Sequence, residues 1–338
     1  MTERVLVTGA TGFIGYHLVQ ALLGTGVEVL CLVRPTSNTS RLETFDVSFV
    51  AGDVILKDSL IPAIATVDTV FHLAGSTTAN RRETHFLVNE EGTRNLVQAC
   101  AQSKHLKRLV VVSSSAAVGP SPLGRPMRED DPPHPISTYG RSKLAGEQAA
   151  RQWAGEIPIT IVRPPIVFGE YDRDVFRMFE LVAHGWHLVP GWRKKYYSLI
   201  HAADLAKGLI LASLKGETLP APDASPITPG QGTYFIADEW APSYAELGPL
   251  MAEALGRKAR ILPVPGVVAW GVALVNEISA RLKNQPSILN LDKAREGLSG
   301  SWVYSPRKAQ QQLGFKPDAS VSERICQTGR WYQEQGWL

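Results

Sequence analysis

The first half of the chain alternates between short apolar runs and helical patterns. Runs rich in β-branched residues occur at 5–8, 28–33, 47–50, 69–73, 109–113 and 157–162. Most of them are continuously apolar, as expected for strands buried on both faces of a sheet. Helical patterns fall between them at 13–23, 59–65, 82–101 and 138–153. This order predicts an α/β fold, a doubly wound parallel sheet with right-handed crossovers.

The second half of the chain follows a different pattern. It has clustered prolines in LPAPDASPITPG (219–230), several helical segments and only a few short strand-like pieces. We therefore expect residues 1–165 to form the sheet domain, with 197–215 and 232–237 returning to it. The remainder of 166–338 is predicted to form a smaller, mostly helical domain.

Three glycines lie between the first apolar run and the first helical pattern, in VLVTGATGFIG (5–15). Gly9 permits a tight turn, Gly12 lets a pyrophosphate approach the backbone, and Gly15 lets helix and strand pack closely. The spacing is G-x-x-G-x-x-G. After the first strand of an alternating chain it predicts a dinucleotide site. Further residues of this loop expected at the site are Thr11, Phe13 and Ile14.

The end of the second strand indicates which dinucleotide binds. NAD-binding folds commonly have a carboxylate there that accepts hydrogen bonds from the ribose hydroxyls. This chain has none and continues with Arg34, whose guanidinium suits a 2′-phosphate. We therefore predict NADP(H) in preference to NAD(H), with NAD(H) as the alternative.

Two later strand ends supply further candidates for cofactor binding. Asp53, followed by Val54, can accept a hydrogen bond from the adenine amino group or be an ordinary turn residue. Leu73, Ala74 and Gly75 leave a small-residue edge against which the cofactor's ribose could lie.

A tyrosine and a lysine lie four residues apart in STYGRSKLAGEQ, so Tyr139 and Lys143 share one helix face. A tyrosine with a pKa near 10 is a poor base at neutral pH, and a neighbouring cation favours the phenolate. The fifth strand ends in three serines, whose hydroxyls could hold a carbonyl oxygen. Together these groups predict proton transfer coupled to a hydride reaction.

These motifs resemble the extended short-chain dehydrogenase/reductase superfamily, also called the NAD-dependent epimerase/dehydratase family. TGATGFIG, HLAG, VNEEGTRNL, VSSSAAVG, YGRSK and RPPIVFG occur in the family's order and spacing over essentially the whole chain. The resemblance implies an NAD(P)-binding Rossmann domain followed by a smaller substrate domain. A homodimer formed through 82–101 and 138–153 would suit the family.

The resemblance also implies roles for single residues. Tyr139 would be the catalytic acid/base, and Lys143 would bind the nicotinamide ribose and lower the pKa of the tyrosine. Ser114 would be the catalytic serine, with Ser115 as the fallback. The remaining assignments are Ser113 facing the cofactor, Asn89 in a structural or catalytic role, and the segment from Pro164 to Val167 passing the nicotinamide.

Two departures from the sequences of nucleotide-sugar enzymes narrow the range of activities that we expect. Ser115 and Ala116 stand where the 4,6-dehydratases carry an acidic pair, so dehydration is not expected. Ile166 replaces an asparagine that many sugar-nucleotide enzymes have. The remaining pattern is similar to 3β-hydroxysteroid dehydrogenases and dihydroflavonol reductases.

We therefore predict an NADP(H)-dependent oxidoreductase acting on a carbonyl or secondary alcohol of a fairly apolar small molecule, steroid-like or flavonoid-like. A nucleotide-sugar epimerase with the same Tyr139–Lys143 pair is the alternative. A non-catalytic nucleotide sensor is disfavoured, because such relatives usually lack the tyrosine or the lysine.

Two stretches have no assigned role. HGWHLVPGWRKKYY (184–197) could stack on a polycyclic substrate, hold a phosphate group, or form a hairpin with solvated cations. PGVVAWGVALV (265–275) is shorter than the roughly 18 residues of a membrane-spanning helix. It predicts a buried or partner-facing helix, with a membrane-surface contact or a lid over an oily substrate as alternatives.

Composition argues against several kinds of partner. The formal net charge of +3 is mild and spread along the chain, which gives no support to nucleic-acid binding. Cys31, Cys100 and Cys326 lack metal-ligand spacing, so we expect reduced thiols and no metal. The chain runs from MTERV directly into a strand, so we expect no secretory leader and a cytoplasmic protein.

Overall fold

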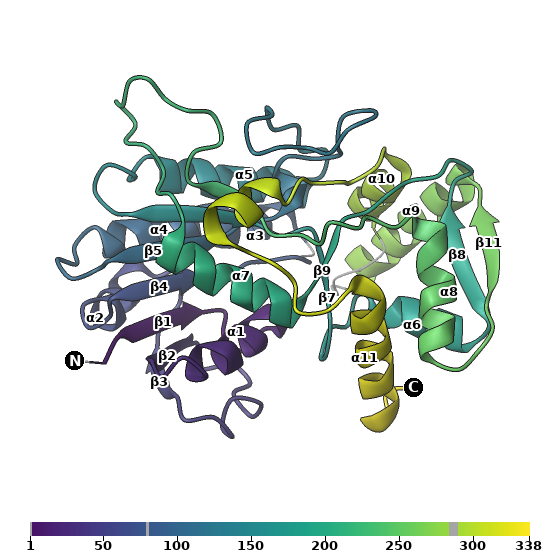
Figure 1. Ribbon diagram of the computed structural model, residues 1–338, viewed down its shortest axis with the longest axis horizontal. Coiled ribbons are helices and arrows are strands. Elements are labelled where there is room, and N and C mark those ends of the chain that lie inside the picture. The colour runs from purple at the N-terminus through teal and green to yellow at the C-terminus, as the bar shows by residue number, and fades with distance from the viewer. Residues whose placement is uncertain (1, 79–80, 284–289) are drawn as a thin grey trace.

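The computed structural model describes residues 2–78, 81–283 and 290–338, and its centre is one seven-stranded sheet (Figure 1). The strand order is β10-β6-β5-β4-β1-β2-β3, and all neighbours are parallel. Its strands are β1 Arg4–Thr8, β2 Glu28–Val33, β3 Ser48–Ala51, β4 Thr69–His72, β5 Arg108–Val112, β6 Ile159–Arg163 and β10 Thr233–Phe235. The predicted doubly wound α/β fold is confirmed.

Helices cover both faces of this sheet and create two separate cores. Along β1, Val5 and Val7 face one core, while Leu6 between them faces the other. The helices against the first core are α1 Phe13–Leu23 and α7 Ala202–Lys215; those against the second are α2 Ile61–Ile64, α4 Gly92–Cys100 and α5 Thr138–Arg151. Burial on both sides explains why the strands are continuously apolar.

One helical pattern is interrupted where the sequence suggested a single helix. Residues 82–101 form α3 Arg82–Phe86, a π-helical turn Leu87–Glu91, and then α4. The turn contains the buried Asn89, and π-turns of this kind often occur at functional sites. Despite the interruption, the segment 82–101 still packs along the sheet as expected.

The sheet order reverses between β1 and β4. The glycine loop leaves β1 toward α1, and the 73–75 edge leaves the adjacent β4, where Thr8 pairs with His72. A crevice at the carboxyl ends of the strands forms at such a reversal, and it is the usual ligand site of open α/β sheets. The two strand ends predicted to contact a cofactor therefore meet there.

The C-terminal elements gather beside the sheet, at the right of Figure 1. Two small parallel pairs were not foreseen: β7 Ile166–Phe168 with β9 Leu199–His201, and β8 Trp186–Pro190 with β11 Arg260–Val264. The helices are α6 Phe176–Ala183, α8 Tyr244–Ala254, α9 Gly266–Lys283, α10 Leu291–Leu298 and α11 Val321–Glu334. Phe179, Met251 and Tyr332 lie in a core that α6, α8 and α11 share. The domain boundary at residue 165 stays a prediction.

The segment 265–275 forms the start of α9, as its pattern suggested, and much of its apolar surface is exposed rather than buried. Within the described ranges, no helix is both long and apolar enough to cross a bilayer.

Candidate active site

The glycine loop is shaped by contacts that leave no room for side chains. Gly9 has a φ of +72°, and a Cβ added to it would lie 2.7 Å from the backbone nitrogen of Ala74. A Cβ added to Gly15 would lie 2.2 Å from the carbonyl oxygen of Gly9. The loop is therefore pressed against both the edge that follows β4 and the start of α1.

The N-terminus of α1 is open to an anion. Gly12 is the N-cap residue, and among the described residues no side chain forms a capping hydrogen bond there. The first-turn N–H groups of an uncapped helix attract a phosphate. Thr11, Phe13 and Ile14 are half-buried around this end. The close backbone approach and the uncapped amides together fit the pyrophosphate of a dinucleotide.

The edge after β4 connects the glycine loop to Lys143. A Cβ added to Gly75 would lie 3.0 Å from Asn89 Oδ1 and 3.6 Å from Lys143 Nζ. Gly9 approaches Leu73 and Ala74, so the structure brings these predicted cofactor residues together.

Asn89 is buried and ties this edge to α5. Its Oδ1 accepts a hydrogen bond from the Ser76 N–H at 2.8 Å, and its Nδ2 donates to the Ser76 carbonyl oxygen at 3.0 Å. Nδ2 also donates to Ser142 Oγ at 2.9 Å. These contacts favour the structural reading of Asn89 over the catalytic one.

The side chain of Ser114 lies beside the hydroxyl of Tyr139 and lowers its pKa. Ser114 is the N-cap residue of the 3-10 helix Ser115–Ala117, and its Oγ accepts from the Ala116 N–H at 3.1 Å. Burial raises the pKa of Tyr139, and the adjacent Ser114 side chain and the charge of Lys293 lower it in part. The hydroxyl of Tyr139 is therefore protonated at neutral pH and available as a proton donor.

Lys143 lies on the same helix face, and its Nζ donates to the Val112 carbonyl oxygen at 2.8 Å. Burial lowers the pKa of Lys143 to about 8. The predicted lowering of the tyrosine's pKa by Lys143 stays a prediction, since in this structure the neighbouring cation that acts on the phenol is Lys293.

Ser113 points to a buried ion pair behind the site. Its hydroxyl donates to Glu147 Oε1 at 2.6 Å, and Arg163 donates to both carboxylate oxygens of Glu147, at 2.8 and 2.6 Å. The Ser113 hydroxyl is thus occupied, and contact with a cofactor would have to come from its backbone. The pair joins α5 to β6, which fixes the helix that carries Tyr139 and Lys143.

The predicted residues at the other end of the crevice lie on strand ends and loops. Arg34 is exposed, in a turn where the Ser37 N–H donates to the Arg34 carbonyl oxygen at 2.9 Å. Asp53 Oδ1 accepts from the Ile55 N–H at 3.1 Å, which also fits the turn reading of this aspartate. Asn95 Nδ2 donates to the carbonyl oxygen of the buried Val54 at 3.0 Å.

The segment after β6 lies next to the serines. The Pro164 carbonyl oxygen accepts from the Ser115 N–H at 2.9 Å. Val167 is half-buried in β7, farther along the same segment. Pro164 is therefore the member of this predicted pair that directly contacts the serine segment.

Sequence reasoning missed α10. Its Asp292 Oδ2 accepts from the Thr138 N–H at 2.6 Å, and Lys293 lowers the pKa of Tyr139. Lys293 Nζ is 3.3 Å from Glu296 Oε2. No local pattern signals these residues, because they are about 150 positions from Tyr139 in the chain.

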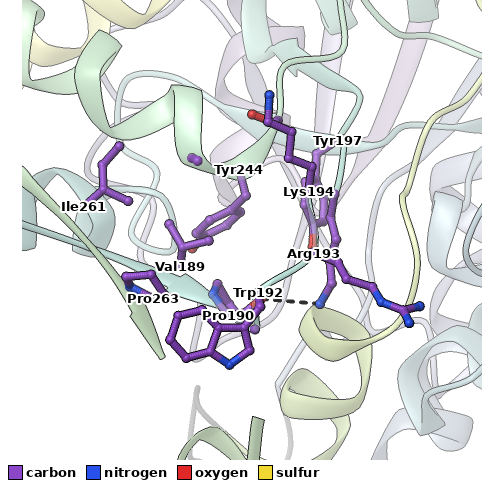
Figure 2. Close-up of a pocket in the computed structure, with 13 residues that line it drawn as sticks. Val189, Pro190, Trp192, Arg193, Lys194, Tyr197, Tyr244, Ile261 and Pro263 are labelled. Atoms are coloured by element: carbon purple, nitrogen blue, oxygen red, sulfur yellow. Dashed lines mark hydrogen bonds between the residues drawn. The ribbon is translucent and has the colours of Figure 1, made fainter. Parts of the chain in front are cut away.

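Figure 2 shows a pocket at the edge of the C-terminal part, lined by Val189–Lys195, Tyr197, Ser243–Ala245, Ile261 and Pro263. Tyr244 and Tyr139 both pack against one buried cluster that includes Tyr197. Lys195 Nζ donates to the Gly297 carbonyl oxygen of α10 at 2.7 Å. The predicted 184–197 stretch therefore forms β8 and the wall of a mostly apolar pocket beside α10, and it is not a hairpin.

The comparisons with known proteins agree with this arrangement. The NAD dependent epimerase/dehydratase family matches residues 5–226. A ceramide reductase of Caulobacter vibrioides is 31% identical, over 99% of this chain and 96% of that protein. A 3-beta-hydroxysteroid dehydrogenase of Mycolicibacterium neoaurum is 29% identical, over 98% and 92%. UDP-glucose 4-epimerase of Thermus thermophilus, in complex with NAD, has the same fold, with a TM-score of 0.76, 24% identity and coverage of 98% and 99%.

The chain therefore belongs to the NAD dependent epimerase/dehydratase family, which confirms the resemblance. It is an NAD(P)-dependent oxidoreductase of the extended short-chain dehydrogenase/reductase type.

Proposed function

We propose that this enzyme uses NADP(H) to interconvert a ketone and a secondary alcohol on an apolar, lipid-like or polycyclic molecule. The observation that carries the proposal is the approach of the Ser114 side chain, just past the carboxyl end of β5, to the Tyr139 hydroxyl, whose pKa it lowers. Lys143 and the glycine loop adjoin this pair through Gly75 and Ala74. A proton donor, a second hydroxyl and a dinucleotide crevice thus meet in one place.

In the reduction direction, the carbonyl oxygen of the substrate lies between the hydroxyls of Ser114 and Tyr139. The dinucleotide, when bound, supplies the hydride. Tyr139 donates its proton to the oxygen as negative charge develops there, and Ser114 stabilises the same oxygen with a hydrogen bond. Lys143 is positioned by the Val112 carbonyl to bind the nicotinamide ribose.

The cofactor residues in this proposal follow the crevice. Gly9 and Gly12 face the pyrophosphate, with Gly15 allowing α1 to pack against the turn. The exposed Arg34 is placed at the 2′-phosphate, and Asp53 at the adenine. Residues 1–165 form the cofactor-binding domain in this proposal, and pairing of two protomers through α4 and α5 is likewise part of it.

The apolar character of the substrate has two supports. Val189, Pro190, Ile261 and Pro263 line the pocket beside α10, together with aromatic side chains. Two relatives aligned over nearly their full lengths are named for a ceramide and for a 3-beta-hydroxysteroid. Both names describe molecules with large apolar frameworks.

The test is a panel of ketones incubated with NADPH and the purified enzyme, followed by absorbance of the reduced cofactor. Long-chain keto lipids and steroid ketones are expected to be reduced, with NADPH preferred over NADH. Short polar ketones serve as the matched comparison. Turnover of the polar ketones alone would contradict the proposed substrate class.

A nucleotide-sugar epimerase is the second candidate, because it would use the same Tyr139 and Lys143. Its support is the fold shared with UDP-glucose 4-epimerase. Incubation with UDP-sugars, analysed for the epimer, distinguishes the two. An epimerase also returns its hydride to the same molecule, so it would retain NAD through purification.

A further inference from the structure

One face of the C-terminal part exposes large apolar side chains beside a group of cations. We propose that this face docks on the surface of an anionic lipid bilayer, without crossing it. It comprises the exposed side of α9, the outer side of the β8–β11 pair and the loop with Trp192, and it is called the apolar face below. The docking does not depend on the proposed reaction.

Helix α9 is arranged with its small side chains inward and its large ones outward. Ala269, Ala273 and Glu277 are spaced by four and form its covered stripe; Ala273 is fully buried, and Glu277 Oε2 accepts from the Leu291 N–H of α10 at 3.2 Å. Its exposed large apolar residues are Val267, Val268, Trp270, Val272, Leu274, Val275 and Ile278. Val267 is 80% exposed and Val275 66%.

This pattern is the reverse of a helix that covers a protein core. An amphipathic helix on a globular protein normally buries its apolar side and exposes its charges. From Gly266 to Ile278 the sequence contains one charged residue, Glu277, and that residue faces α10. The exposed surface of α9 is therefore suited to an apolar medium.

The outer side of the β8–β11 pair also exposes large apolar side chains. In its register Trp186 lies opposite Arg260, and Leu188 lies opposite Leu262. The alternate residue His187 is buried and bonds to the Tyr244 carbonyl oxygen of α8, so the Trp186 and Leu188 side of the pair is the outer one. The outer side thus exposes two leucines, a tryptophan and an arginine.

The loop after β8 joins the two parts. The Gly191 N–H donates to the Val264 carbonyl oxygen at 2.8 Å, which holds the next residue, Trp192, near the start of α9. Trp192 is 77% exposed, and Figure 2 shows its indole extending from the loop near Pro263. Tryptophan is favoured at the boundary between lipid headgroups and acyl chains.

The charge of this region favours an anionic surface. The segments 186–197 and 257–279 contain six cations and one carboxylate, Glu277. The cations are Arg193, Lys194, Lys195, Arg257, Lys258 and Arg260. Apolar residues with tryptophan, bordered by Lys and Arg, are the usual composition of a segment that lies in a membrane interface.

The same charge distinguishes the membrane from a second copy of the chain. In a two-fold dimer formed through this face, the cations of one protomer would lie against the same cations of its partner and repel them. An anionic bilayer neutralises them and covers the apolar side chains at once. Trp192 of the apolar face also lines the pocket beside α10, so docking would place that pocket near the membrane surface.

The experiment is cosedimentation of the full chain with vesicles of phosphatidylcholine, with or without phosphatidylglycerol. We expect binding to the phosphatidylglycerol vesicles that weakens as salt is raised. Val267→Asp combined with Val275→Asp should weaken it at least about tenfold, since both side chains would enter the interface. Arg193→Glu combined with Lys194→Glu should weaken it at least about 25-fold, at about fivefold per neutralised cation.

Matched variants separate docking from general changes of surface. Leu123→Asp replaces a fully exposed leucine away from the apolar face, and Lys104→Glu with Arg307→Glu reverses two exposed cations elsewhere. These should bind as wild type does. The charge variants replace exposed side chains, so they test the proposal even if an α9 variant fails to fold.

Two outcomes would overturn the proposal. The first is no cosedimentation of the wild type, or equal binding of wild type and face variants. The second is a wild-type dimer that the face variants convert to monomer without any vesicle binding, which would make this face an interface between copies. Neither outcome bears on the proposed reaction, because the ketone assay that tests it needs no vesicles.

Discussion

Asp292 of α10 accepts a hydrogen bond from the backbone N–H of Thr138, 2.6 Å away, immediately before Tyr139. The next residue of α10, Lys293, lowers the pKa of the half-buried Tyr139, while Glu296 raises it. A helix of the C-terminal part is thereby fixed at the start of α5 and acts on the proposed proton donor. The electrostatics of Tyr139 depend on both halves of the chain.

This relationship predicts opposite pH shifts for two variants. Lys293→Met removes a charge that lowers the pKa of Tyr139, so the alkaline limb of kcat/KM for ketone reduction should move to higher pH. Asp174→Asn removes a charge that raises this pKa, so the limb should move to lower pH. The measurement is the pH profile of NADPH-dependent reduction. Shifts in the same direction, or none, would contradict the assignment of Tyr139 as proton donor.

Ser114 and Ser115 should differ sharply in their effect on the rate. The side chain of Ser114 lies beside the Tyr139 hydroxyl and lowers its pKa, whereas Ser115 is buried and its carbonyl oxygen accepts from Tyr304 Oη at 3.3 Å. Ser114→Ala should lower kcat about 10²-fold, as expected for loss of one donor to a developing oxyanion. Ser115→Ala is the matched control and should keep near-normal kcat. The reverse result would move the catalytic role to Ser115.

The buried carboxylate behind the site should dominate the stability of this region. Glu147→Gln leaves Arg163 without its charge partner and should cost about 3–5 kcal/mol in the free energy of unfolding. Ser113→Ala, which removes the hydroxyl bonded to Glu147, should cost about 1 kcal/mol. Urea unfolding of the three proteins at neutral pH provides the comparison.

The same carboxylate predicts a dependence on acid. Arg163 and the neighbouring hydrogen bonds hold the pKa of Glu147 below its usual value despite burial. The contribution of Glu147 is therefore complete above the pKa of an unfolded glutamate and is lost as pH falls through its lower folded value. The difference in the free energy of unfolding between wild type and Glu147→Gln should therefore become smaller at acid pH. A constant difference would show that the charge of Glu147 is not what stabilises the pair.

The strands of the central sheet could be predicted because the apolar residues within most of them show burial on both faces. β1 and β2 have apolar residues on both faces, and α1 follows a glycine turn at a strand end, so local sequence suffices. Tyr139 and Lys143 were found for the same reason, as neighbours on one helix. Glu147 continues their four-residue spacing and could have been found from it.

The missed features depend on contacts between distant parts of the chain. β8 pairs with β11 about 70 residues later, and Lys293 reaches Tyr139 from α10. Ser113 has the same sequence surroundings as Ser114, and only the packing of Glu147 shows where its hydroxyl points. The helix of 265–275 was predicted from its pattern, whereas its exposure follows from how α9 packs on α10.

Arg34 carries the prediction about cofactor preference. Arg34→Ala should raise the Kd for NADP about 10–100-fold, because a charge-assisted hydrogen-bonded contact contributes about 1.5–3 kcal/mol. The Kd for NAD, which lacks the 2′-phosphate, should change little and serves as the internal control. Titration calorimetry with both nucleotides measures this. Equal losses for NADP and NAD would place Arg34 away from the 2′-phosphate.

The central claim is that hydride passes from the dinucleotide to a ketone carbon while Tyr139 protonates the oxygen. It is tested most directly with NADPH deuterated at nicotinamide C4 and the best ketone of the panel. We predict deuterium on the carbinol carbon of the alcohol, and a rate about 10²–10⁴-fold lower for a folded Tyr139→Phe variant. Alcohol formed without the label, or at an undiminished rate by Tyr139→Phe, would contradict the account.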